Sequence, residues 1–167
     1  MTTEELHVDP AERNWIVASI MLLVVFGVAV AIAGFMLGIQ VPTEEQRVDP
    51  RTVAQEAPWS NPGVRELVPG EEYEVYILAS RFSFVPNTFE VPVGARVTFY
   101  VTSTDVQHGF KLQDTNVNFM ALPGQVSKLT TTFEEPGTYS YICTEYCGLG
   151  HAVMAGSVTV TEPGGNA

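Results

Sequence analysis

The sequence predicts an all-β domain, folded as a sandwich or Greek-key barrel, joined to one N-terminal membrane helix. From residue 73 onward, short segments rich in aromatic and β-branched residues alternate with turns that contain Pro or Gly, and no helical pattern appears among them. Before them, residues 15–39 form an uncharged, largely apolar run. A chain of 167 residues suits one domain of ordinary size with an appendage.

The apolar run at residues 15–39 is long enough to cross a bilayer. About 20 apolar residues span the hydrocarbon core, and Trp15 lies at one end of the run, as interfacial aromatic residues do. A cleaved signal peptide would have a basic leader and a shorter apolar core, whereas the segment at residues 1–14 is polar and acidic. We therefore expect a retained transmembrane anchor.

Residues 40–70 are expected to form a linker, because prolines recur through them and block regular helix. These prolines are Pro42, Pro50, Pro58, Pro62 and Pro69. Trp59 is an aromatic residue in this otherwise polar stretch. The sequence leaves open whether its side chain packs on the membrane interface, on a partner or on its own domain.

The β domain is expected at residues 71–162. Its predicted strands lie at residues 73–79, 88–92, 96–102, 110–112, 117–122, 126–133, 138–143 and 155–161. Turns are predicted at residues 92–95, at Pro123-Gly124 and at residues 135–137. Residues 163–167 are rich in Gly and are expected to be a flexible tail.

The formal net charge is −11 at neutral pH. An acidic chain repels the phosphates of nucleic acid, so no nucleic-acid partner is expected. The charge suits a surface that attracts a basic partner at low salt, and an acidic surface that only keeps the protein soluble accounts for it equally well. The sequence offers no pair of nucleophile and base and no paired carboxylates, so no catalytic residue is predicted on this chain.

The segment at residues 143–154 concentrates soft metal ligands with the spacing C-x3-C-x3-H-x2-M. These ligands are Cys143, Cys147, His151 and Met154. Thiolate, imidazole and thioether groups select copper or zinc over hard cations. Gly148 and Gly150 allow the backbone conformations that a wrapped loop needs, and His108, at the start of an apparent strand, adds a second imidazole.

Three other interpretations account for these ligands less completely. A disulfide between Cys143 and Cys147 would close a very small loop and would leave the His and Met unexplained. A zinc site with two Cys and two His ligands would leave Met154 unexplained. A mononuclear blue-copper site uses one Cys, whereas two thiolates can bridge two copper ions, each completed by one His.

The segment resembles the dinuclear CuA motif C-x-E-x-C-G-x-x-H-x-x-M of cytochrome c oxidase subunit II, and the upstream Asp-Val-x-His that ends at His108 matches as well. The resemblance covers most of the chain and implies a cupredoxin fold for the β domain. The ligands that it implies are Cys143 and Cys147 as bridges, His108 and Met154 on one copper ion, and His151 and the Glu145 carbonyl oxygen on the other.

The same resemblance implies a function. The chain would be an electron-accepting relay that takes electrons from cytochrome c, or another soluble donor, and passes them to a haem in subunit I. There oxygen would be reduced to water and protons would be pumped. The chain would lie in lipid as a single-pass protein of the cell membrane, with its N-terminus cytoplasmic and its copper domain periplasmic or extracellular. The Lys and Arg count near the ends of the anchor weakly favours the reverse orientation, and we follow the resemblance.

Two acidic residues beside the ligands are further candidates. In many family members the Glu at the position of Glu145 also contacts a magnesium ion at the boundary with subunit I, so the resemblance makes Glu145 a candidate ligand for such an ion, although one carboxylate cannot hold a hard cation alone. Asp105 lies three residues before His108. It is expected either to anchor the ligand loop or to be an ordinary turn acid, and the sequence favours neither.

The chain departs from the commonest subunit II pattern, which has two membrane helices and a prominent tryptophan before the copper motif. Here one helix is predicted, and the comparable aromatic residues are Phe82 and Phe84. The chain is therefore most similar to the single-helix subunit II of B-type haem–copper oxidases. The two phenylalanines either lie near the site or, because they alternate along an apparent strand, belong to the core, and we favour the core.

Other functions share part of this pattern. A CuA subunit of a nitric oxide reductase would have the same anchor and ligands, and a membrane-tethered copper carrier would bind one exchangeable ion. A quinol-oxidase subunit would lack the ligands. The chain contains no C-x-x-C-H, so we expect no covalent c-type haem and a separate electron donor.

Overall fold

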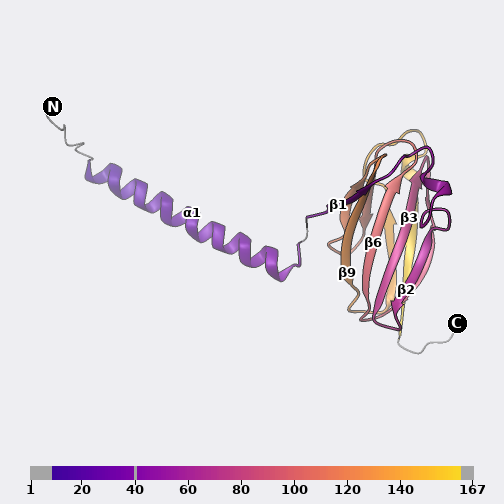
Figure 1. Cartoon of the computed structure of the whole chain (residues 1–167). Coiled ribbons are helices and arrows are strands. Elements are labelled where there is room, and N and C mark those ends of the chain that lie inside the picture. The colour runs from indigo at the N-terminus through magenta and orange to yellow at the C-terminus, as the bar shows by residue number, and fades with distance from the viewer. Residues whose placement is uncertain (1–8, 40, 163–167) are drawn as a thin grey trace. The chain divides into compact units, whose positions relative to one another are not determined.

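The computed structural model describes residues 9–39 and 41–162 and divides into two units, Met1–Ile39 and Gln40–Ala167 (Figure 1). Helix α1 (Pro10–Met36) forms the first unit, and the β domain forms the second. Residues 1–8 of the expected polar segment and the expected tail at residues 163–167 lie outside the described residues.

Helix α1 begins at Pro10, earlier than the apolar run that starts at Trp15. The carboxylate of Asp9 accepts a hydrogen bond from the N–H of Ala11 at 2.7 Å, and proline suits the first helical position because no N–H is needed there. The 27-residue helix is about 40 Å long, which exceeds the hydrocarbon thickness of about 30 Å.

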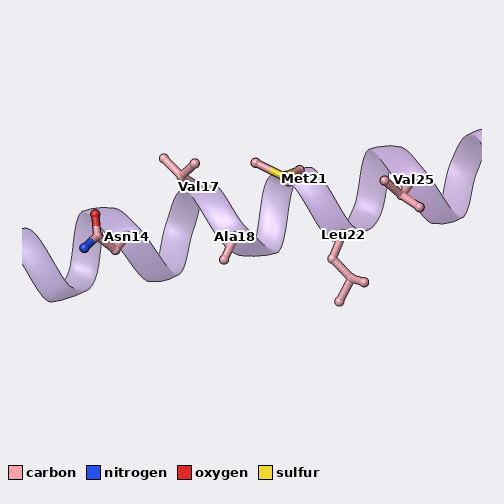
Figure 2. A pocket seen from close by; sticks show the side chains of 6 residues that line it. All are labelled: Asn14, Val17, Ala18, Met21, Leu22 and Val25. Carbon is pink, nitrogen blue, oxygen red and sulfur yellow. The ribbon is translucent and has the colours of Figure 1, made fainter.

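The surface of α1 is apolar and uncovered. Its most apolar window has a mean hydropathy of 2.9, and none of its residues is buried. Figure 2 shows the N-terminal half of the helix, where residues spaced three and four apart share one face. A surface groove there is lined by Asn14, Val17, Ala18, Met21, Leu22 and Val25. Length and composition together make α1 a candidate membrane span.

Among the described residues the β domain contains eleven strands in two packed sheets (Figure 1). The strands are β1 (Thr43–Arg47), β2 (Gly63–Val68), β3 (Glu72–Ser80), β4 (Ser83–Val85), β5 (Thr88–Pro92), β6 (Arg96–Ser103), β7 (His108–Leu112), β8 (Asn118–Ala121), β9 (Gln125–Thr132), β10 (Gly137–Ile142) and β11 (Ala155–Thr161). One sheet has the order β1-β9-β6-β3-β2, with β4 paired to β3, and the other has the order β5-β11-β10-β7-β8. The β3–β6 and β5–β11 pairs are parallel.

Part of the linker expected at residues 40–70 folds onto the domain instead. Strand β1 pairs with β9 and strand β2 pairs with β3, and the short 3₁₀ helix η1 (Val53–Gln55) lies between them in sequence. Both strands are sheet edges, where neighbouring prolines are tolerated. The proline pattern predicted a linker because it does not show that β1 pairs with β9 and β2 with β3. This pairing makes the two segments strands.

Strand β3 shows how alternation builds the core. Val75, Ile77 and Ala79 face the main hydrophobic cluster between the sheets, while Tyr76 and Leu78 face the opposite side. On that outer side a second cluster consists of Val53, Trp59, Leu78 and Val126.

Trp59 packs on its own domain, which decides between the interpretations that the sequence left open. Its side chain is 2% exposed, and its ring lies edge-on to Tyr76 with centroids 5.2 Å apart. Burial of a tryptophan contributes several kcal/mol, so the segment around Trp59 is held firmly on the sheet. The expectation that Phe82 and Phe84 lie in the core is confirmed for Phe84, which is 1% exposed, and is wrong for Phe82, which is 36% exposed.

Candidate metal centre

The predicted ligands gather at one end of the β5-β11-β10-β7-β8 sheet. His108 is the first residue of β7, and Cys143 directly follows the last residue of β10. Strand β10 pairs with β7 on one side and with β11 on the other. The loop from residue 143 to residue 154 contains the 3₁₀ helix η2 (His151–Val153). It therefore starts beside the start of β7, and its end at Met154 lies beside Cys143, whose N–H donates to the Met154 carbonyl at 3.1 Å.

Aromatic packing in the core sets the direction of two ligands. Phe110 stacks on Tyr141 with ring centroids 4.9 Å apart, and both side chains are fully buried. Since residues two apart on a strand share a face, His108 points to the same side as Phe110. Cys143 points inward with Tyr141 for the same reason, and it is 5% exposed.

The two cysteines and two histidines form a chain of close contacts. The Sγ atoms of Cys143 and Cys147 lie 3.9 Å apart. The Nδ1 atom of His108 lies 3.9 Å from the Cys143 sulfur, and the Nδ1 atom of His151 lies 3.9 Å from the Cys147 sulfur. Each sulfur therefore has one imidazole beside it, and both cysteines are free thiols.

The two remaining predicted ligands also reach the sulfurs. The carbonyl oxygen of Glu145 accepts from the Cys143 thiol at 3.2 Å, and the Met154 sulfur lies 3.7 Å from the Cys147 sulfur. Met154 is 2% exposed. The structure thus brings together every ligand that the sequence predicted.

The spacing and chemistry of these atoms fit a soft metal. Metal–ligand bonds of about 2.0–2.3 Å at tetrahedral angles place donor atoms roughly 3.5–3.8 Å apart, close to the 3.7–3.9 Å observed. Burial raises the pKa of the Cys147 thiol, and the neighbouring Cys143 raises it further. Because the buried thiol holds its proton more tightly than usual, a bound cation is what would make it a thiolate.

Asp105 orients His108 and anchors its loop. Its Oδ1 atom lies 2.9 Å from Nε2 of His108, which leaves Nδ1 facing the sulfur of Cys143. Burial raises the pKa of Asp105, but the hydrogen bonds from His108 and from the N–H groups of Arg81 and Val106 outweigh it and lower the pKa to about 2. The ionised carboxylate accepts a hydrogen bond from the Nε2–H group of the His108 ring and so fixes the tautomer of the ring. Asp105 thus contacts both the predicted ligand His108 and the backbone of Arg81.

The sequence analysis missed one contact that shapes the site. A Cβ at Gly109 would lie 2.9 Å from the backbone nitrogens of Thr144 and Glu145 and would also collide with the Thr144 hydroxyl. The first turn of the ligand loop therefore rests directly on the β7 backbone. A glycine inside a predicted strand, next to a predicted ligand, is the signal that could have indicated this close approach.

The chain is similar to one protein family over most of its length. The family model described as cytochrome C oxidase subunit II, periplasmic domain, matches residues 68–161. Cytochrome c oxidase subunit 2 of Thermus thermophilus is 44% identical over 154 residues, which cover 90% of this chain and 92% of that protein. The heme-copper oxidase subunit 2 of Aeropyrum pernix is 37% identical over 78 residues, covering 46% of this chain and 33% of that protein.

Solved structures agree with the sequence comparison. A chain of a heme-copper terminal oxidase dimer determined by cryo-electron microscopy superposes with a TM-score of 0.75 at 33% identity, covering 90% of this chain and 99% of that chain. The periplasmic domain of subunit II of cytochrome oxidase from Bradyrhizobium japonicum superposes with a TM-score of 0.51 at 22% identity, covering 54% and 84%, and supports the fold alone.

The predicted fold class, an all-β cupredoxin-like domain with one N-terminal helix, is confirmed. The resemblance to cytochrome c oxidase subunit II, on which the functional prediction depended, is confirmed as well. The similarity extends over nearly the full length of a relative and includes both the anchor and the β domain. This chain belongs to the cytochrome c oxidase subunit II family, whose members are membrane-bound components of haem–copper oxidases.

Proposed function

We propose that this chain accepts electrons for a haem–copper cytochrome c oxidase through a dinuclear CuA centre. The observation that carries the proposal is the pair of buried thiols 3.9 Å apart, each with one imidazole beside it. Membership of the family implies that the chain binds copper and that it joins subunit I in an oxidase complex. The number of copper ions and the roles of the individual ligands are the proposal.

In this proposal the thiolates of Cys143 and Cys147 would be shared by the two ions. His108 and Met154 would complete the ligands of one ion, and His151 and the Glu145 carbonyl oxygen would complete those of the other. When bound, the copper pair supplies a one-electron carrier whose change in charge is shared between two ions.

The chain's own residues shield four of the ligands from water, while His151 is half-buried. His108 is 0% exposed, and Cys143, Cys147 and Met154 are at most 7% exposed. A buried, apolar shell excludes water and controls the redox potential of a metal. The ligands stand on paired strands, so their positions need little adjustment when an electron arrives.

The position of Met154 favours copper over zinc. Its sulfur lies in the same buried cluster as the cysteine sulfurs. A tetrahedral zinc site is already complete with two Cys and two His ligands, whereas a weak thioether ligand is characteristic of copper centres. The thioether thus has a role only in a copper site.

We propose a soluble cytochrome c, or a similar one-electron protein, as the donor. Three apolar or aromatic side chains of the ligand loop face solvent: Tyr146 is 78% exposed, Leu149 is 98% exposed and Val153 is 79% exposed. They offer an apolar docking surface within a few residues of the ligands. An electron crossing this surface would have a short path to the metal.

We further propose that α1 crosses the cell membrane with its N-terminus cytoplasmic, in contact with lipid and with subunit I. The β domain would then lie on the periplasmic or extracellular side. Among the described residues, α1 is the one helix long and apolar enough to span a bilayer. A single span supports membership of the single-helix, B-type group. The domain limits would be a transmembrane helix at residues 15–39 and a copper domain at residues 71–162, extended by the strands before it.

A magnesium ion at the boundary with subunit I is the last part of the proposal. The Glu145 carbonyl faces Cys143, and none of the described residues donates a hydrogen bond to the Glu145 carboxylate or forms an ion pair with it. The carboxylate is thus available to a second metal. Since one carboxylate cannot hold a hard cation alone, subunit I would supply the other ligands.

Counting metal ions tests the copper proposal. The full chain purified in detergent and loaded with copper is expected to hold two copper ions and to give the paramagnetic resonance spectrum of one electron shared by both. Cys147→Ser is expected to remove one ion or both and to abolish this spectrum, because a single thiolate cannot bridge the pair in the same way. A single exchangeable Cu(I) in the unchanged chain would identify a copper carrier instead.

The orienting role of Asp105 predicts a loss of copper affinity when its carboxylate is removed. Asp105→Ala is expected to lower the affinity about 10–100-fold, the usual cost of losing the partner of a ligating histidine. Competition with a copper chelator measures this. Glu90→Ala removes the same charge from an exposed position of β5 and is expected to leave the affinity unchanged. Equal losses in both variants would contradict the role of Asp105.

The docking surface predicts a specific defect in electron uptake. Leu149→Glu places a charge in the apolar surface and is expected to slow electron transfer from reduced cytochrome c about tenfold without loss of copper. Stopped-flow mixing of the assembled oxidase with the reduced donor measures the rate. Leu67→Glu, on the 55% exposed Leu67 of β2, is the control, and the same slowing in this variant would rule out the surface.

The magnesium proposal predicts that Glu145→Gln lowers the magnesium content of the purified oxidase complex and leaves its copper content intact. The substitution keeps the backbone carbonyl and removes only the charged carboxylate. Elemental analysis of the two complexes decides the point. Equal magnesium in both would exclude Glu145 as a ligand.

A further inference from the structure

The turn between β3 and β4 lies against the ligand loop. Phe82, in this turn, has its ring beside two glycines of the loop. A Cβ built at Gly150 would lie 2.5 Å from Cγ and 2.9 Å from Cβ of Phe82, and one built at Gly148 would lie 2.9 Å from Cε1. Real Cβ atoms essentially never show distances this short, so neither glycine has room for a side chain. The Phe82 ring therefore packs directly on the backbone of the loop.

These glycines flank the ligands of the loop. Gly148 follows Cys147, and Gly150 precedes His151. Gly148 has a φ of +132°, so its backbone alone favours glycine. Gly150 has a φ of −92°, which any residue adopts. Contact with Phe82 is therefore the reason that the structure offers for glycine at position 150.

The turn that contains Phe82 is itself held in place. The N–H of Arg81 donates to Oδ2 of Asp105 at 2.8 Å, and the hydroxyls of Ser80 and Ser83 lie 3.3 Å apart across the turn. On its other side, Phe84 is buried edge-on to Phe110. The backbone of this turn is thus anchored to the scaffold on both sides of Phe82.

The carboxylate of Asp105 contacts both the turn that contains Phe82 and the ligand His108. Asp105 accepts from Arg81 at the turn and lies 2.9 Å from Nε2 of His108. Phe82 of this turn covers the segment of the ligand loop that joins Cys147 to His151. One turn therefore links the histidine of β7 to the histidine of the loop.

We infer that Phe82 is a positioning residue for the copper centre, and this inference rests on the proposed function. Its ring packs on Gly148 and Gly150 and so sets where Cys147 and His151 stand relative to His108. Ligands held by such packing need no reorganisation to bind metal. Phe82 would act through the loop, without contacting the metal.

A size exchange between Phe82 and Gly150 tests this. The full chain in detergent is compared as the unchanged protein, Gly150→Ala, Phe82→Ala and the double variant. Gly150→Ala is expected to lower the melting temperature of the metal-free chain by about 5 °C, because overpacking displaces the loop or the ring. In the copper-loaded chain it is expected to speed copper loss to a chelator about tenfold and to alter the paramagnetic resonance spectrum.

The double variant shows whether contact with the Phe82 ring causes the effect of Gly150→Ala. When the ring is absent, Gly150→Ala is expected to change neither the melting temperature nor the spectrum beyond the effect of Phe82→Ala itself. The matched control is Leu149→Ala, between the two glycines, whose 98% exposed side chain is expected to give the same small effect with and without the ring. Equal damage from Gly150→Ala in both backgrounds would overturn the inference.

The experiment still decides the role of Phe82 if one variant does not fold or if the chain does not bind two copper ions. Should Gly150→Ala not fold, folding of the double variant supports the inference and its failure to fold overturns it. Should the unchanged chain bind fewer than two copper ions, the proposed function fails. The melting temperatures of the metal-free variants would still decide whether Phe82 positions the loop.

Discussion

The pairing of β7 with β10, locked by the stacking of Phe110 on Tyr141, is the constraint on which the candidate metal centre depends. Each aromatic residue lies two positions from a ligand, and strand geometry carries its orientation over to His108 or Cys143. The ligand loop begins and ends on strands paired side by side. The packing of the aromatic core thus sets the positions of the donor atoms at the end of the sheet. No strong interaction among the donor atoms is needed for this.

Burying these donors costs free energy unless each polar atom has a partner. His108 meets this cost through Asp105, whose carboxylate is kept ionised by hydrogen bonds despite its partial burial. The thiols have only each other and weak acceptors, and the pKa of Cys147 is raised accordingly. The site therefore favours a bound cation, which would replace thiol protons and give the sulfurs, the imidazoles and the Met154 thioether a common partner. The exposed apolar side chains of the same loop leave its outer surface free for another protein.

Most strands could be predicted because burial on one face imposes alternation, as in β3, β6 and β9. Three strands were missed: β4 has only three residues, and β1 and β2 carry no such signal. Strand β1 reads Thr-Glu-Glu-Gln-Arg and contains no apolar residue, and β2 is a half-exposed edge strand. Edge strands are stabilised by backbone pairing with a neighbour, and their own side chains need not reveal it. The same reason explains Trp59: its burial depends on residues of β3 and β9 that no local pattern connects with it.

The sequence by itself determined which atoms could bind metal, since ligand type and spacing within one loop are local properties of the chain. It also determined the family, the anchor and the alternating strands. Only the tertiary structure decided what stands around the ligands: that Asp105 holds both His108 and the Arg81 turn, and that Phe82 lies on the ligand loop at Gly150. The parallel β3–β6 pair brings the β3–β4 turn beside the loop before β7. Contacts between segments so far apart in sequence arise from strand order, which short-range patterns of residues do not encode.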